Sequence, residues 1–566
     1  MKEGNFMKTW KKVGLGTVTL ASVALLAACG GGSSKSDAGR APQLAIPTDI
    51  TTLDSTLNTD TYSNIFIGNT EEGAMRVNSD GKAVPALAES VTASSDGLTY
   101  DIKLRSGLKW SNGTPLTAKD FVYAWQRAVN PATGSQYAYL LGNIQNANKI
   151  MGLKTATQAD LDTLGVKAVS DTELKVTLTQ PTPYFDFLLA ESVYYPLNQQ
   201  FVEKYGKEYG TSSDKTLYCG PFVFKGSGWT GTNESFKLVK NKDYYDPSSV
   251  KSNEVDYQVV KNPTTAVQLF KQGKLDQVGL GTPDLYNANK GYTKNAKLIS
   301  LKESTTDYIE YNQTGKGTSN PTAAKALQNQ KIREALNLAT DRQSIVENST
   351  AGSSVATGFT PAGMAKTSTG EDFAKYAAQP YTYDVAKAKT LWEEGLKEIG
   401  ATSVNLSYET DADSPTAKTQ ADFLQTSLAK ALPGLTITEK IVPFQQRLKD
   451  SAAHNFDMVN SLWGGDYAEP STFLQLFAAG SGYNDGGFVN SAYQAAWTKA
   501  STMPDVTNDA ARDADYKAAE QALYDQASIN PIYFRTTPAL TNPNMTGLDF
   551  HGTGLSYDLK SVYINK

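Results

Sequence analysis

The sequence predicts an α/β protein of several domains. In the second half of the chain, helical periods of apolar residues alternate with short apolar stretches of strand length. The chain has 566 residues, too many for one ordinary hydrophobic core, so two to four domains are expected. With 40% hydrophobic and 20% charged residues, its composition is that of a soluble globular protein rather than a disordered or multi-span membrane protein.

The amino terminus has the pattern of a bacterial export signal. Lysines precede an uncharged run, residues 13–26, which is too short and too weakly apolar for a convincing spanning helix. The sequence Leu-Ala-Ala-Cys29 that follows resembles the lipobox of bacterial lipoproteins. We expect residues 1–28 to be a lipoprotein signal peptide, Cys29 to carry the lipid, and residues 29–40 to form a flexible tether.

Charge, cysteine and histidine content exclude several classes of partner. Loss of residues 1–28 removes four lysines and one glutamate, so the formal charge changes from −5 to −8. Such an acidic surface argues against nucleic acid. The second cysteine, Cys219, has no intrachain partner, which leaves neither a disulfide framework nor a zinc site. With only His454 and His551 a multi-histidine metal site is impossible, and we expect no cofactor.

The first third of the chain contains strand, turn and capping signals in sequence. A strand is expected at residues 44–46, and Asn78-Ser-Asp-Gly81 is typical of a hairpin turn. Asp96-Gly97 predicts a tight turn before residues 98–105, which alternate apolar and polar side chains. Thr117-Ala-Lys-Asp120 has the outline of a capping box that begins a helix.

The remainder predicts alternating helices and strands without a catalytic or nucleotide-binding motif. Gly226-Ser-Gly-Trp-Thr-Gly231 matches G-x-G-x-x-G, but it lies between two strand-like runs and is interpreted as a hairpin turn. Neither a P-loop nor a nucleophile elbow is present. Helical periods cover residues 323–338, 386–396 and 417–432, and strands are expected at residues 404–408 and 435–438.

The residues that best suit a ligand-binding site follow residue 455. Residues 456–463 predict a buried strand. Gly464 and Gly465 have no side chains, so a ligand could approach the backbone closely at the end of this strand. Asp466 then places a carboxylate beside bare backbone groups, with Trp463 and Tyr467 as aromatic walls. This combination suits a peptide with a free α-amino group.

A structural alternative exists for the same aspartate. Asp466 could instead cap a helix that begins near Pro470 and runs through residues 473–477. Glu469 and Ser471 compete for that cap.

Several motifs resemble a known family. Pro85-Ala-Leu-Ala-Glu-Ser90, Asp96-Gly-Leu-Thr-Tyr100 and the run from Trp110-Ser-Asn-Gly-Thr-Pro to Ala124-Trp-Gln-Arg127 closely resemble the oligopeptide-binding proteins of ABC importers. These belong to the family 5 extracellular solute-binding proteins, which also serve dipeptides, nickel and other solutes. The resemblance continues to the carboxyl end, through Ile332-Arg-Glu-Ala-Leu336 and Pro531-Ile-Tyr-Phe534.

The resemblance implies a type II periplasmic-binding-protein-like fold: two lobes with a hinge, an extra inserted domain, and mixed sheets flanked by helices. The sequence offers boundaries in suitable places. One lobe would comprise residues 41–71, 182–304 and 531–566, with the inserted domain at residues 72–181. The other lobe would be residues 305–530, and the crossings near 305 and 530 would form the hinge.

The resemblance also implies the roles of individual residues. Asp466 would pair with the peptide α-amino group, because members typically carry Trp, two residues and then Asp-Tyr here. The peptide backbone would pair, as a strand does, with Leu462, Trp463, Gly464 and Gly465 on one lobe, beside Tyr467, and with the segment around Asp60 and Tyr62 on the other. Weaker candidates are Tyr483, Asn484, Tyr311 and Asn312, each of which also has a structural interpretation. Asn460 stands where some relatives carry a basic residue that meets the C-termini of short peptides, and the absence of that residue favours longer or unanchored ligands.

The function implied is that of a monomeric, lipid-anchored receptor on the extracellular face of the cell membrane. It would bind an oligopeptide between its lobes and deliver it to ABC permease subunits driven by cytoplasmic ATPases. The alternatives are a receptor of the same family for nickel, haem or a signalling peptide, and a lipid-anchored secreted hydrolase.

Overall fold

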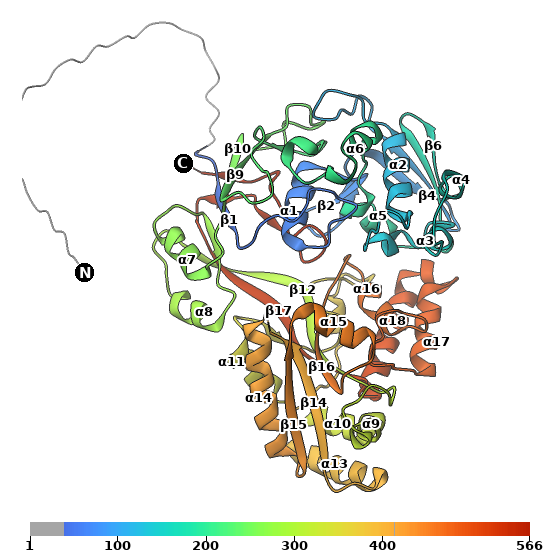
Figure 1. Ribbon diagram of the computed structural model, residues 1–566, viewed down its shortest axis with the longest axis vertical. Coiled ribbons are helices and arrows are strands. Elements are labelled where there is room, and N and C mark those ends of the chain that lie inside the picture. Colours follow the sequence, from blue (N-terminus) through green and yellow to red (C-terminus); the bar gives the residue numbers. More distant parts are fainter. Residues whose placement is uncertain (1–38, 413, 566) are drawn as a thin grey trace, which may run out of the picture. The chain divides into compact units, whose positions relative to one another are not determined.

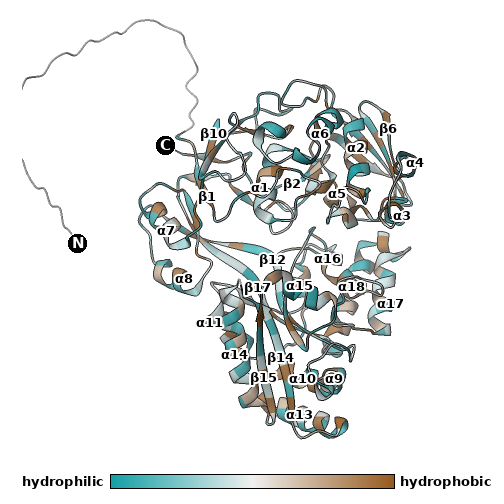
Figure 2. Ribbon diagram, in the orientation of Figure 1, coloured by the Kyte–Doolittle hydropathy of each residue, from teal (hydrophilic) through white to brown (hydrophobic). Residues whose placement is uncertain are grey.

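The computed structural model describes residues 39–412 and 414–565 (Figure 1). The expected signal peptide, Cys29 and all of the expected tether except its last two residues lie outside the described residues. The fold is α/β, with several sheets flanked by helices, as predicted. Along its helices and strands, hydrophobic and hydrophilic residues are interleaved (Figure 2). Within the described ranges no helix is long and apolar enough to cross a bilayer.

The first sheet has four strands, of which only the edge strand β1 runs parallel to its neighbour. In sheet order they are β1 (Gln43–Ile46), β10 (Glu254–Val259), β9 (Ser235–Lys240) and β8 (Phe222–Phe224). Helix α1 (Thr61–Thr70) packs on its apolar face. There the Phe66 ring meets the rings of Phe236 and Tyr257 edge to face, with centroids 5.0 and 4.9 Å away.

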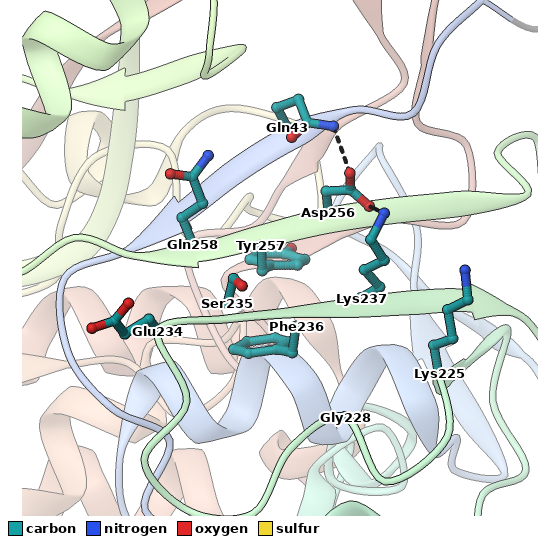
Figure 3. Close-up of a pocket in the computed structure, with 10 residues that line it drawn as sticks. All are labelled: Gln43, Lys225, Gly228, Glu234, Ser235, Phe236, Lys237, Asp256, Tyr257 and Gln258. Carbon is teal, nitrogen blue, oxygen red and sulfur yellow. Dashed lines mark hydrogen bonds and ion pairs between the residues drawn. The ribbon is translucent and has the colours of Figure 1, made fainter. Parts of the chain in front are cut away.

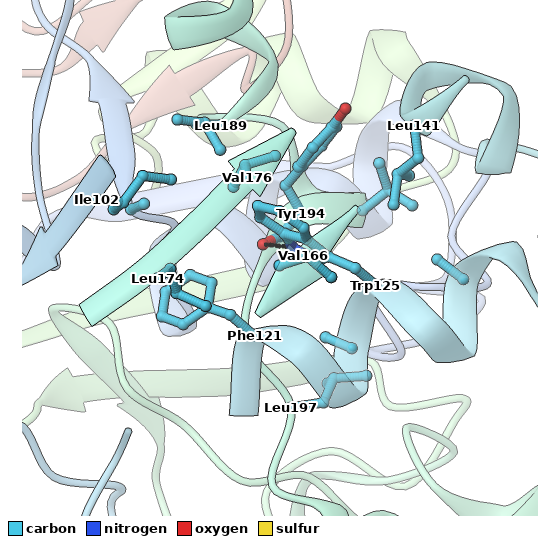
Figure 4. Packing of buried hydrophobic residues seen from close by; sticks show 14 of the residues in the cluster. Ile102, Phe121, Trp125, Leu141, Val166, Leu174, Val176, Leu189, Tyr194 and Leu197 are labelled. Atoms are coloured by element: carbon cyan, nitrogen blue, oxygen red, sulfur yellow. Dashed lines mark hydrogen bonds between the residues drawn. The ribbon is translucent and has the colours of Figure 1, made fainter. Parts of the chain in front are cut away.

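A second four-stranded sheet lies in the region of the expected insertion. Its order is β4 (Ala88–Ala93), β5 (Thr99–Leu104), β7 (Glu173–Thr177) and β6 (Val166–Ser170), all antiparallel. Helix α2 (Ala118–Val129) begins at the predicted capping box of Thr117 and Asp120. Its Trp125 is fully buried in the core shown in Figure 4, where the indole N–H donates to the Tyr194 carbonyl at 2.8 Å.

The third sheet has seven strands and carries the stretch that contains Asp466. Its strands are, in order, β11 (Gln277–Gly279), β17 (Ile529–Thr541), β12 (Lys297–Tyr311), β16 (Met458–Gly464), β14 (Val404–Asp411) and β15 (Leu435–Val442), with β13 (Ser354–Val355) paired to β17. Strands β14, β15 and β16 run parallel to one another and end at the same edge of the sheet.

Two long strands run through both expected hinge crossings. Strands β12 and β17 pair side by side (Figure 1), and their register shifts between Lys302 and Thr306 and again after Asp307. These shifts are bulges, which bend and twist a strand pair locally. The domain boundaries themselves remain a prediction.

The remaining helices and short strands connect and cover these sheets. Near the second sheet they are β2 (Met75–Val77), β3 (Ala83–Pro85), η1 (Ala138–Leu141), α3 (Ala147–Met151), α4 (Gln158–Leu161), α5 (Phe185–Leu188), η2 (Ser192–Tyr194), α6 (Gln199–Tyr205), η3 (Gly206–Glu208) and η4 (Ser213–Lys215). Beyond it come α7 (Pro263–Lys271), α8 (Pro283–Asn289), α9 (Pro321–Gln328), α10 (Gln330–Ala339), α11 (Arg342–Ser349), α12 (Phe373–Tyr376), α13 (Val385–Ile399), α14 (Pro415–Ala431) and α15 (Phe444–Ala452). The last are α16 (Ser471–Leu474), η5 (Gln475–Phe477), α17 (Ser491–Ser501), η6 (Asp505–Thr507), α18 (Asp509–Asp525), β18 (Met545–Thr546), β19 (Asp549–Phe550), β20 (Tyr557–Asp558) and β21 (Tyr563–Ile564).

Local sequence signals located most elements, with one notable departure. The turns at residues 78–81 and 96–97 and the hairpin at residues 226–231 form, as do the strands expected at residues 44–46, 98–105, 404–408, 435–438 and 456–463. The helical period at residues 323–338 is divided into α9 and α10. The break occurs at Asn329, whose extended backbone ends one helix and whose side chain accepts from Ile332 N to cap the next.

Candidate functional site

One edge of strand β16 is open where the strand ends. Strand β14 pairs with β16 only at Met458 and Val459, whereas β12 pairs along its whole length. The N–H of Gly465 donates to Ser304 O at 2.7 Å on the β12 side. Because backbone groups alternate in direction along an antiparallel pair, those of Leu462 and Gly464 point away from β12. No described strand pairs with them, so an extended peptide could add here.

The carboxylate of Asp466 lies just beyond this open edge. The hydroxyl of Tyr139 donates to Asp466 Oδ2 at 3.1 Å, and Thr472 Oγ1 lies 3.4 Å from the same oxygen. No cation among the described residues forms an ion pair with it. Burial raises the pKa of Asp466 to about 6, although the two hydroxyls oppose the rise. The site therefore holds a carboxylate that a ligand ammonium would stabilise in its charged form.

Aromatic rings surround the carboxylate. The ring of Tyr483 meets Trp463 at 5.1 Å and Tyr139 at 6.1 Å, both edge to face, and Tyr137 lies 5.9 Å from Tyr139. Tyr483 is 44% exposed, and the indole N–H of Trp463 has no partner among the described atoms. Ring faces attract cations, so this wall complements Asp466 for a positively charged group.

The structure decides between the two interpretations of Asp466. The carboxylate that caps α16 belongs to Glu469, whose Oε2 accepts from Ser471 N at 2.9 Å. Asp466 meets this turn only through the Thr472 hydroxyl: its N–H donates to Thr472 Oγ1 at 3.0 Å and its Oδ2 accepts from that hydroxyl at 3.4 Å, whereas its carboxylate accepts from no backbone N–H of α16. The Asp466 side chain is therefore not the helix cap, and the capping interpretation is wrong.

Four other candidates have structural roles. Tyr467 is 2% exposed and stacks on Tyr184 with centroids 4.4 Å apart, so it does not wall an open cleft as expected. Tyr311 is fully buried, and its hydroxyl donates to Asn337 Oδ1 at 2.7 Å. The remaining two, Asn312 and Asn484, use their amides to hold nearby backbone carbonyls.

The expectation of a strand-like segment at Asp60 and Tyr62 is also wrong. Asp60 is the N-cap of α1, and its carboxylate accepts from Ser63 N at 2.8 Å and from the Thr51 hydroxyl at 2.5 Å. Tyr62 stands in the first helical turn and is 36% exposed. The Asp60 cap and the burial of α1 against the first sheet form a helix here although residues 61–70 contain no strong helix former.

The position of Asn460 is closed to ligands in this structure. Its Nδ2 donates to Asp307 Oδ2 at 2.9 Å, and Gln420 Nε2 donates to the other oxygen at 3.0 Å. Asn460 is 1% exposed. Burial raises the pKa of Asp307 to about 7. Asn460 therefore forms part of a buried polar cluster beneath the strand and does not face a ligand.

A separate cavity of about 590 Å³ lies on the first sheet (Figure 3). Two of its charged side chains are paired with each other: Asp256, which accepts from Gln43 Nε2 at 2.8 Å, lies 3.0 Å from Lys237 Nζ. Within the described part of the chain no three His, Cys, Asp or Glu side chains are grouped as metal ligands. The free carboxylate and open strand make the Asp466 region the stronger candidate site.

Sequence reasoning missed the tyrosines of the second sheet's region. Tyr137 and Tyr139 flank the start of η1, and the contact between Tyr139 and Asp466 spans 327 positions in the chain. The only local signal is the pair of tyrosines in Gln136-Tyr-Ala-Tyr139. Nothing in that pair indicates the distant carboxylate.

Comparison with known proteins gives a consistent result. A sequence model described as bacterial extracellular solute-binding proteins, family 5 Middle, matches residues 82–485. A dipeptide-binding protein of Lactococcus lactis subsp. cremoris (strain MG1363) is 57% identical over 99% of this chain and 100% of its own length. The oligopeptide-binding protein OppA of Bacillus subtilis (strain 168) is 32% identical over 97% of this chain and 98% of its own.

The fold agrees with that of a solved relative. The structure of Listeria monocytogenes OppA bound to peptide superposes with a TM-score of 0.75 at 34% identity, covering 93% of this chain and 99% of that chain. The family model covers well over half of the present sequence. This chain belongs to family 5 of the bacterial extracellular solute-binding proteins.

Proposed function

We propose that this protein captures peptides outside the cell and delivers them to the permease of an ABC importer. The observation that carries the proposal is the unpaired Asp466 carboxylate at the end of an open strand edge. An extended peptide would add its backbone to Leu462 and Gly464 and place its α-amino group at Asp466. The names of the relatives from Lactococcus lactis and Bacillus subtilis support a peptide as the ligand.

Backbone pairing explains broad sequence tolerance. Main-chain N–H and C=O groups are common to all peptides, so side chains affect affinity only through the space around them. The open edge offers two outward-facing residues, and alternate residues of a strand are roughly 7 Å apart. We therefore propose short peptides as ligands, in line with the name of the relative that is 57% identical. This departs from the expectation of longer peptides, which rested on Asn460.

The membrane arrangement is part of the same proposal. Lipid on Cys29 would hold the receptor at the extracellular face of the membrane, and ATP would be used by other chains. Metabolic labelling with a radioactive fatty acid tests this arrangement. Label should appear in the wild type and be lost in Cys29→Ser, and equal labelling of both would contradict it.

The function is tested by binding to the chain truncated after Cys29. Calorimetry should show that wild type binds a free tripeptide far more tightly than its N-acetylated form. Truncating one side of a buried charge pair costs ~2–5 kcal/mol of binding free energy. Asp466→Asn should therefore lose most of the difference in affinity between the free and the N-acetylated tripeptide. Undiminished discrimination by Asp466→Asn would refute the assignment of the α-amino group.

Two further measurements separate the proposal from its alternatives. Mass spectrometry of peptides carried through purification should recover short peptides, and a length series by calorimetry should favour them. Incubated peptide should remain intact, whereas cleavage would indicate the hydrolase. Small-angle scattering should show compaction with peptide, because closure follows from the ligand's higher affinity for the closed form. Compaction only with nickel or haem would indicate another ligand class.

A further inference from the structure

A second carboxylate, that of Glu191, comes from a segment tied to the neighbours of Asp466. Glu191 lies between α5 and η2. Before α5, Tyr184 stacks on Tyr467, the residue after Asp466. At the end of η2, the Tyr194 hydroxyl donates to Leu140 O at 2.8 Å, next to the tyrosine that bonds Asp466. Both ends of the segment are thus anchored beside the proposed α-amino site.

The Glu191 carboxylate has no partner of its own. Among the described residues it accepts no hydrogen bond and joins no ion pair. It is partly exposed, and one of its oxygens lies 2.6 Å from where a Cβ on Gly554 would stand. A cavity of about 20 Å³ adjoins it, and the one arginine in that lining, Arg76, is engaged by Glu72 and Asp558. The lining also contains His551, and burial lowers the pKa of its imidazole, so neither side chain supplies a free cation to Glu191.

The charge of Asp466 affects Glu191, and the charges of both carboxylates affect the same tyrosine hydroxyl. Burial, and then the charge of Asp466, raises the pKa of Glu191 well above its ordinary range. The pKa of Tyr137 is raised by burial and then by the charges of Asp466 and Glu191, which places its hydroxyl within reach of both fields. One ligand ammonium would satisfy one carboxylate and leave the other unpaired. Two positive groups on the same ligand residue would satisfy both.

We infer that Glu191 selects peptides whose first residue has a cationic side chain. The inference rests on the proposed function: Asp466 takes the α-amino group, and Glu191 takes the ammonium or guanidinium of a first-position Lys or Arg. The ring of Tyr137, 5.9 Å from that of Tyr139, belongs to the aromatic wall beside Asp466, and aromatic faces favour such cations. A neutral first residue leaves Glu191 unpaired, so it binds more weakly.

The test compares Lys-Ala-Ala with norleucine-Ala-Ala, which differ by a terminal ammonium. Calorimetry with wild type should give at least about tenfold tighter binding of the lysine peptide, since one charge-assisted contact is worth about that much or more. In Glu191→Gln the two peptides should bind equally. Glu203→Gln is the matched control, because Glu203 is an exposed carboxylate on α6 bonded only by Gln199, and it should keep the preference.

The outcomes are separable from those of the proposed function. Asp466→Asn should weaken both peptides and leave their ratio largely intact. A preference that survives in Glu191→Gln, or is absent in wild type, overturns the inference. Equal weakening of both peptides by Glu191→Gln also overturns it, because the carboxylate would then serve the α-amino group. Since Glu191 has no partner to lose and burial raises the pKa of its carboxyl, Glu191→Gln should melt at or above the wild-type temperature at neutral pH.

Discussion

The raised pKa of Asp466 predicts that peptide affinity falls as the pH is lowered through 6. An ammonium binds the ionised carboxylate, and burial makes that ion costly before the ligand arrives. With a pKa of about 6, about nine-tenths of the carboxylates are ionised at pH 7 and about one-tenth at pH 5. Affinity should therefore fall about tenfold between these values, or ~1.4 kcal/mol.

The direction of this pH dependence follows from the linkage between proton binding and peptide binding. The bound ammonium stabilises the charged form, so the pKa of Asp466 is lower in the complex than in the free protein. Binding near pH 6 must then release a proton, and binding well above pH 7 must not. Below pH 5 the same proton must be removed before the ammonium can pair.

Calorimetry with norleucine-Ala-Ala from pH 5 to 8 measures this effect. Repeating the titration at pH 6 in buffers of different ionisation enthalpy gives the number of protons released, expected to approach about half of one. Asp466→Asn should show neither the slope nor the release. A wild-type affinity that is flat across this range, or a slope retained in Asp466→Asn, would refute the reasoning.

Three further predictions concern stability. Asp54→Ala should destabilise the protein by ~3–5 kcal/mol in urea, because it leaves the Arg127 guanidinium buried without its bidentate partner. Glu310→Gln should make the melting temperature fall less steeply from pH 5 to 8. Burial raises the pKa of Glu310 to about 8, so the stability that comes from its protonated carboxyl is complete at acid pH and is lost as the pH rises. Tyr184→Leu and Tyr467→Leu should show a coupling energy of ~0.5–1.5 kcal/mol in a double-mutant cycle, because their rings stack.

Each stability prediction has a matched control or a contrary result. Glu89→Gln breaks an exposed ion pair with Lys103 and should cost less than ~1 kcal/mol, and a cost equal to that of Asp54→Ala would contradict the role of burial. A melting profile of Glu310→Gln as steep as wild type would place the titration in another group. Additive effects of the two tyrosine substitutions would show that the stack contributes nothing beyond packing.

Local sequence patterns predicted elements where one local rule dominates. Thr117 and Asp120 form their capping box because four consecutive positions at one helical turn decide it. The strand-like segment at Asp60 was wrong because it rested on the family resemblance and overlooked a local signal. The Asp60 side chain caps a helix that buries Phe66 against the first sheet.

The sequence by itself determined the α/β class and the family resemblance, and it marked Asp466 as a candidate, because strand period, glycine pair and aspartate are adjacent in the chain. Only the tertiary structure decided what surrounds that aspartate. It gave the helix cap to Glu469, buried Tyr467, and brought Tyr139 from 327 positions away to the carboxylate. Packing between distant segments has no local signature, so burial, pKa and the open strand edge follow from the fold and not from any single stretch.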